Sequence, residues 1–124
     1  MATPGSVIGW TLDQQERAGL LEQYPPRYAK AVAHHVTLAT DAADREPPPA
    51  VRAAIVGRTD DDSGVEAMVV TIDGETARPD GSTFHITWSL GEGRRARESN
   101  DVLKERGWSR FGQPVDITLT PARF

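Results

Sequence analysis

Two tripeptides of the same form, His35-Val36-Thr37 and His85-Ile86-Thr87, carry the side chains of this chain best suited to chemistry. Each lies in an apolar, β-prone run, and residues i and i+2 of a strand project from the same face. Each tripeptide therefore presents one imidazole and one hydroxyl side by side. Imidazole gives and takes protons near neutral pH, so a pair can supply the acid and the base for a displacement at phosphorus. The alternative is two half-buried strands in which histidine and threonine merely suit the pleated surface.

Length and composition set the class of protein. The chain has 124 residues, of which 38% are hydrophobic and 26% are charged, and this predicts a single globular domain over residues 1–124. No apolar run reaches the roughly 18 residues of a membrane span, and the first residues do not resemble a secretory signal. The absence of cysteine excludes disulfides and Cys-type zinc sites. We therefore expect a cytoplasmic protein without a membrane segment.

Charge is unevenly distributed along the chain. The net charge of −4 argues against a general nucleic-acid coat, but residues 91–110 contain six basic and four acidic side chains. This segment follows the second tripeptide closely, so it could provide a local basic patch for a phosphate. The alternative is a solvated helix face with ion pairs between residues three and four apart.

Periodicity and turn residues predict the elements that must position the two tripeptides. Two helices are expected, the first capped by Thr11 and ended before Pro25-Pro26, the second ended by Gly107. The helices cover residues 11–23 and 94–106, and strands cover 32–40, 51–59, 64–73, 83–90 and 114–120, with a hairpin between the second and third strands. This order predicts an α+β fold with a mostly antiparallel sheet. The 50-residue spacing of the tripeptides suggests two related halves forming a cleft.

The doubled His-x-Thr pattern resembles the two-histidine (2H) phosphoesterase superfamily. The stretch HITWSLGEGRRARESNDVL is similar to part of the cyclic phosphodiesterase domain of plant- and fungal-type tRNA ligases, including the Glu98-Ser99-Asn100 step that opens the helix. The first tripeptide and the closing VDITLTPARF resemble the first motif and the last strand of that domain, so the resemblance covers most of residues 30–124. The phosphate-binding loop of those ligases' kinase, GxxxxGK[ST], does not occur here.

The resemblance implies hydrolysis of a 2′,3′-cyclic phosphate, on an RNA end or a nucleotide, to a 2′-phosphate. By this analogy His85 is the base toward water and His35 the acid toward the leaving oxygen, although the roles could be reversed. Thr37 and Thr87 would donate hydrogen bonds to the phosphoryl oxygens. No cofactor or metal is implied, since two imidazoles can move both protons. We expect a bell-shaped rate profile between roughly pH 5 and 8, because one imidazole must be neutral and the other charged.

Further residues are candidates for substrate contact. Ser89 shares the strand face of the second tripeptide, and Tyr24 and Trp108 could stack on a base. Arginines after the strand could hold phosphate or sugar: Arg94, Arg95 and Arg97. His34 is one residue out of register and is expected to face away from His35, which disfavours a zinc site formed by this pair.

Two other functions fit the same residues. One is a 2H-type phosphodiesterase that acts on a cyclic oligonucleotide messenger, because the same four side chains would meet the same phosphorus chemistry. The other is a non-catalytic nucleotide- or RNA-binding module of the same fold. The expected partner is a nucleotide or an RNA end bearing a cyclic phosphate, and the sequence shows no sign of an obligate protein partner.

Overall fold

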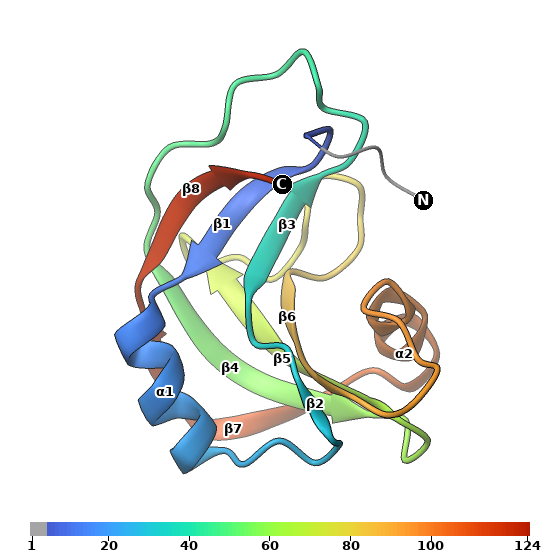
Figure 1. Ribbon diagram of the computed structural model, residues 1–124. Coiled ribbons are helices and arrows are strands. Elements are labelled where there is room, and N and C mark those ends of the chain that lie inside the picture. Colours follow the sequence, from blue (N-terminus) through green and yellow to red (C-terminus); the bar gives the residue numbers. More distant parts are fainter. Residues whose placement is uncertain (1–4) are drawn as a thin grey trace.

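A computed structural model describes residues 5–124 and has an α+β architecture (Figure 1). The strands of this part of the chain form two antiparallel sheets, accompanied by two helices. The α+β class and the antiparallel pairing are therefore confirmed, although there are two sheets and not one. The elements are β1 (Ile8–Leu12), α1 (Gln14–Gln23), β2 (Lys30–Ala31), β3 (His35–Ala39), β4 (Ala53–Asp60), β5 (Val65–Ile72), β6 (His85–Leu90), α2 (Glu98–Arg106), β7 (Ser109–Ile117) and β8 (Leu119–Arg123).

The larger sheet has the order β2-β6-β5-β4-β7 and contains the second tripeptide. The expected hairpin is present as β4 and β5, whose alternating and β-branched residues pair from Ala53↔Ile72 to Asp60↔Glu66. Strand β6 pairs with β5 and carries His85, Ile86 and Thr87 at its start. All six residues of β6 are buried, so its polar face meets protein or a pocket, not open solvent.

The smaller sheet, β3-β1-β8, carries the first tripeptide. Its central strand β1 was not predicted from the sequence, because VIGWTL was assigned partly to the helix expected at 11–23. In the structure Thr11 pairs with His35 of β3, and the helix begins after Asp13, whose side chain accepts a hydrogen bond from the Glu16 amide. Asp13 and not Thr11 is therefore the N-cap.

The C-terminal half also departs from the expected boundaries. Helix α2 begins at Glu98 instead of residue 94, because the Arg94 side chain is held by Asp61 and Ser63 of the β4–β5 turn. Gly107 ends the helix with φ 67°, as predicted. The strand expected at 114–120 is two strands, β7 in the larger sheet and β8 in the smaller one.

The two sheets share one hydrophobic core. Trp10 of β1 and Val36 of β3 belong to the same buried cluster as Ile55, Met68 and Ile86 of the larger sheet. The buried indole of Trp10 donates to the Pro49 carbonyl and that of Trp88 to the Tyr24 carbonyl, so neither ring leaves a polar atom unpaired. This shared core fixes β3 relative to β6. Neither helix in the described part of the chain is long and apolar enough to cross a bilayer.

Gly9 decides how closely β1 approaches the strand of the first tripeptide. A Cβ atom on Gly9 would lie 2.1 Å from the Val36 carbonyl oxygen and 3.1 Å from the Leu38 amide nitrogen, both of which are backbone atoms. We expect Gly9→Ala to lower the free energy of unfolding by about 1–3 kcal/mol, the cost of overpacking, because β3 must shift. Urea denaturation measures this change.

Gly19→Ala is the matched control for this substitution. Gly19 is exposed within α1 and its added Cβ would meet nothing within 4 Å, so we expect stabilisation by about 0.5–1 kcal/mol. An unchanged stability of the Gly9→Ala variant would contradict the close approach of β1 and β3.

Candidate active site

The four residues of the two His-x-Thr motifs line one pocket. His35 and Thr37 reach it from β3, and His85 and Thr87 from β6, around a cavity of about 240 Å³. The i, i+2 spacing within each strand thus places imidazole and hydroxyl on one face, and the approach of β3 to β6 brings the two pairs together. This volume lies below the ~300–1,000 Å³ typical of pockets for drug-sized ligands, so the pocket suits a small ligand or one part of a larger one.

His85 is held by a backbone carbonyl just before its own strand, β6. Its Nδ1 lies 2.8 Å from the Thr83 carbonyl oxygen, which can only accept, so Nδ1 carries the hydrogen and Nε2 is the nitrogen with a free lone pair. Burial lowers the pKa of His85, the Thr83 hydrogen bond partly opposes this, and the positive charge of Arg78 lowers the pKa further. His85 is therefore a neutral imidazole at neutral pH, in a tautomer suited to accept a proton at Nε2.

His35 is held by a second histidine. Its Nδ1 lies 3.0 Å from Nδ1 of His34, and the ring of Phe124 packs over it at 4.5 Å between centroids. Burial lowers the pKa of His35 to about 4, and the charges of His34 and His85 contribute in the same direction. When His35 carries both protons, its Nδ1–H can donate to a neutral His34.

The expectation that His34 faces away from His35 is wrong. Strand alternation does not apply to His34, because β3 begins at His35 and the preceding Ala33 has a left-handed backbone with φ 42°. The chain turns there, and the two rings meet at 76° with centroids 5.2 Å apart. Within residues 5–124, no group of three or more His, Cys, Asp or Glu side chains gathers as metal ligands.

Thr87 is connected to the start of helix α2. Its hydroxyl lies 2.9 Å from Oγ of Ser99 and donates to the Ala96 carbonyl at 3.2 Å. Ser99 is fully buried, so this contact fixes the helix against β6. If Ser99 donates to Thr87, the single hydrogen of Thr87 is still donated to the Ala96 carbonyl, so a ligand in the pocket would compete with Ala96 for it.

Three further polar residues line the pocket and were not singled out from the sequence: Thr40, Arg78 and Asn100. Arg78 comes from the loop between β5 and β6, and Asn100 from the first turn of α2. No strand or helix pattern marks Arg78, so only its spatial position reveals it. Asn100 ends the Glu98-Ser99-Asn100 step at the start of helix α2, and that step was the available signal.

Among the arginines proposed for substrate contact, only Arg97 lines this pocket. It is exposed and has no ion pair within the described part of the chain. Arg95 lies on a neighbouring depression that also includes Arg97 and Asn100. Arg94 is instead a structural residue, because its guanidinium pairs with Asp61 at 2.8 Å and with Glu98 at 3.2 Å.

The structure does not place Ser89 or Tyr24 at the pocket. Ser89 is fully buried, donates to the buried carboxylate of Glu66 at 2.7 Å and accepts from the Tyr28 amide. The loop that precedes β2 thus covers the end of the β6 face. The Tyr24 ring stacks on Phe111, with centroids 5.3 Å apart. Trp108 is likewise engaged, under the guanidinium of Arg110.

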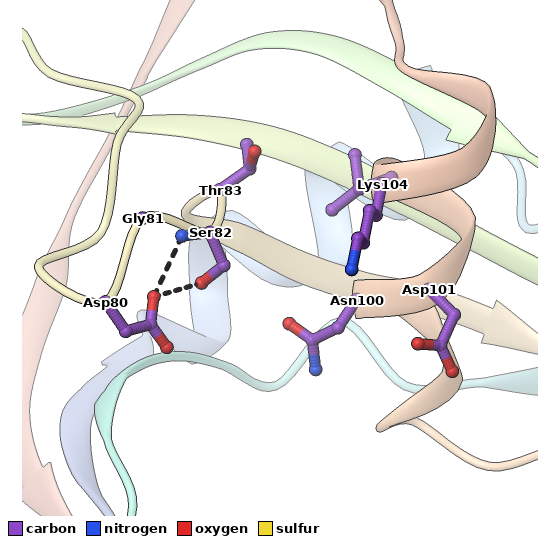
Figure 2. A pocket seen from close by; sticks show the side chains of 8 residues that line it. Asp80, Gly81, Ser82, Thr83, Asn100, Asp101 and Lys104 are labelled. Atoms are coloured by element: carbon purple, nitrogen blue, oxygen red, sulfur yellow. Dashed lines mark hydrogen bonds between the residues drawn. The ribbon is translucent and has the colours of Figure 1, made fainter.

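A second depression adjoins the site between the 80–83 loop and helix α2. Figure 2 shows Asp80, Ser82 and Thr83 facing Asn100 and Lys104 across it, and Asn100 lines both this depression and the histidine pocket. The loop is ordered by Asp80, which accepts from the amide and hydroxyl of Ser82. The loop also supplies the Thr83 carbonyl that holds His85, so its conformation bears directly on the site.

Comparisons with protein-family models, with curated proteins and with solved structures find no match to this chain. Function must therefore be inferred from the side chains of the site and their surroundings.

The lowered pKa of His35 has a consequence for acid stability. Between the ordinary pKa of 6.5 and the native value of about 4, the unfolded state binds more protons than the native state, so stability falls as the pH decreases through this range. We expect His35 to account for a loss on the order of 2–3 kcal/mol. Urea denaturation at pH 7 and pH 4.5 measures it, and the loss should be smaller in His35→Gln than in His34→Gln. Equal acid sensitivity of the wild type and His35→Gln would contradict this prediction.

Proposed function

We propose that this protein is a 2H-type phosphoesterase that hydrolyses a 2′,3′-cyclic phosphate, on an RNA end or a nucleotide, to a 2′-phosphate. The observation that carries the proposal is the convergence of His35, Thr37, His85 and Thr87 on one pocket. The resemblance to the cyclic phosphodiesterase domain of plant- and fungal-type tRNA ligases supplies the reaction. A pocket of this size, lined by arginine and hydroxyl groups, suits an anionic phosphoryl group and its ribose.

In the proposed reaction, water attacks phosphorus as the bond from phosphorus to the ribose 3′-oxygen breaks. His85 Nε2 takes the proton of the attacking water, a role supported by the tautomer that the Thr83 carbonyl imposes. His35 gives its proton to the departing 3′-oxygen, which becomes a hydroxyl, and His34 provides an acceptor for the other proton of the His35 cation. The products are a 2′-phosphomonoester and a free 3′-hydroxyl, and the two imidazoles then exchange protons with solvent.

The two threonines would stabilise the charge that develops on the non-bridging oxygens. Thr37 offers its hydroxyl directly from β3. Thr87 does so by exchanging its hydrogen bond to the Ala96 carbonyl for one to the substrate, while its oxygen accepts from Ser99.

Loss of either histidine should abolish most of the turnover. We expect His35→Ala and His85→Ala each to lower kcat by about 10²–10⁴-fold, the usual contribution of a general acid or base. The substrates are 2′,3′-cyclic mononucleotides, an RNA oligomer ending in a cyclic phosphate, and cyclic dinucleotides, with products resolved by chromatography. The position of the phosphate on the product, 2′ or 3′, tests the leaving group.

His34→Ala tests the support of His35, because this exposed side chain contacts His35 without lining the pocket, and we expect a smaller loss of turnover than in His35→Ala. Turnover of cyclic dinucleotides alone would move the assignment to a messenger-cleaving phosphodiesterase. Binding of every ligand without turnover would indicate a nucleotide- or RNA-binding module.

The pKa directions also predict the pH profile. The productive free enzyme has a neutral base and a protonated acid, and the pKa values of both histidines lie below 6.5. The bell of log kcat/KM should therefore be centred on the acid side of pH 6.5. A bound phosphodiester anion raises the pKa of His35 toward its ordinary value, so the profile of kcat should lie at higher pH than that of kcat/KM. Identical profiles centred above pH 7 would contradict the assignment.

A further inference from the structure

Arg78 is the one strongly anchored cation at the wall of the histidine pocket among the described residues. Only 9% of its side chain is exposed. Its Nε donates to Ser82 Oγ at 2.7 Å and its two terminal nitrogens donate to the Thr37 carbonyl at 3.3 Å and to Asn100 Oδ1 at 3.0 Å. The guanidinium is therefore fixed by its own loop, by the strand of the first tripeptide and by helix α2.

These contacts do not satisfy the whole guanidinium group. Arginine has five N–H donors, and the described residues accept from Nε–H and from one N–H of each terminal nitrogen. The other two N–H groups have no acceptor within residues 5–124. Because Arg78 lines the pocket, these N–H groups are available to an oxygen atom of an anionic ligand that enters it.

The charge of Arg78 is also incompletely neutralised. Its acidic neighbour Asp80 approaches Nε at 3.3 Å, but the Asp80 side chain is 62% exposed and also accepts from Ser82. The other three groups that accept hydrogen bonds from the Arg78 guanidinium are neutral: the Ser82 hydroxyl, the Asn100 amide and the Thr37 carbonyl. Positive charge therefore remains available at the pocket wall, and it lies close enough to His85 to act on the pKa of that imidazole.

We propose that Arg78 binds a non-bridging phosphoryl oxygen of the substrate, as a third oxyanion-binding group beside Thr37 and Thr87. The proposal rests on the function proposed above and extends it to a residue that neither the His-x-Thr pattern nor the predicted basic segment includes. Because the guanidinium is fixed before a ligand arrives, little reorganisation is needed when charge develops on phosphorus. The neighbouring Arg97 differs, since it is exposed at the rim and its charge is screened by solvent.

Phosphate binding tests this proposal without requiring turnover. The probes are inorganic phosphate and a nucleoside 2′-monophosphate, titrated into the protein and followed by ³¹P NMR and by amide shifts. We expect Arg78→Gln to weaken binding roughly tenfold or more, and Arg78→Lys to retain part of it, because lysine keeps the charge and loses the fork. Arg110→Gln is the matched control and should change the affinity less than about threefold, because this exposed arginine lies over Trp108 and does not line the histidine pocket.

Catalysis provides the second measurement. If the contact strengthens in the transition state, Arg78→Gln should lower kcat by roughly 10²-fold with a smaller change in KM. Ser82→Ala removes one anchor and keeps the charge, so its kcat should stay above that of Arg78→Gln. Melting temperatures and amide spectra identify any variant that fails to fold, and if Arg78→Gln fails, Arg78→Lys decides. Affinity and kcat of Arg78→Lys equal to those of Ser82→Ala support the phosphate contact. Values lower than those of Ser82→Ala by tenfold or more would overturn a role based on charge.

The results separate this proposal from the proposed function. Wild-type turnover together with unchanged phosphate affinity and kcat in Arg78→Gln would overturn the role of Arg78 and leave the phosphoesterase standing. Arg78-dependent binding of phosphate without turnover of any substrate would overturn the catalytic function and leave the phosphate contact standing.

Discussion

The site depends on how the segment before β3 crosses from one sheet to the other. Val32 and Ala33 donate their amides to carbonyls of β6, at Trp88 and Thr87, and two residues later the chain pairs with β1. The left-handed backbone of Ala33, with φ 42°, makes this change of sheet possible. The crossing brings the first tripeptide beside the second, since the Ala33 amide donates to the carbonyl of Thr87, which belongs to the second tripeptide.

The crossing leaves the regular hydrogen-bonding pattern of both sheets, so its carbonyl groups need other partners. Arg17 of α1 provides them, with Nη2 donating to the Val32 carbonyl at 3.0 Å and Nε to the Ala33 carbonyl at 3.1 Å. The carbonyl of His34 accepts from the amide of Leu12 at the end of β1. The N-terminal helix is therefore part of the support of the site, although it contributes no side chain to the pocket.

Local patterns in the sequence were sufficient for three strands of the larger sheet. The alternation of β6 and the hairpin of β4 and β5 were predictable, because their residues match a half-buried strand and a polar turn. Strand β1 was not, since the capping potential of Thr11 and its pairing with His35 compete, and only the tertiary contact decides between them. The His-x-Thr spacing predicted which side chains share a face of each strand. It could not predict that they meet, because that depends on the crossing.

The same limit explains why some candidates for substrate contact lie outside the pocket in the structure. Ser89 satisfies the strand periodicity, but the loop before β2 covers it and Glu66 accepts its hydrogen bond. Arg94 belongs to the basic segment, but it is used to join the β4–β5 turn to α2. Arg78 has no sequence pattern at all, because its partners come from three separate parts of the chain. Residues anchored through tertiary contacts are thus the ones that sequence reasoning assigns least well.

Burial has opposite effects on the two roles that the proposed reaction gives to the histidines. Removal of the imidazoles from water lowers their pKa values, which favours a neutral base and disfavours a charged acid. In the proposed reaction, a phosphodiester anion in the pocket would reverse the balance for His35, because its charge would stabilise the imidazolium. The hydrogen-bond partners of the two histidines differ in a corresponding way. The Thr83 carbonyl holds His85 in one tautomer, whereas His34 can donate to or accept from His35. The geometry therefore keeps one imidazole fixed as an acceptor and lets the other change its protonation state when an anion binds.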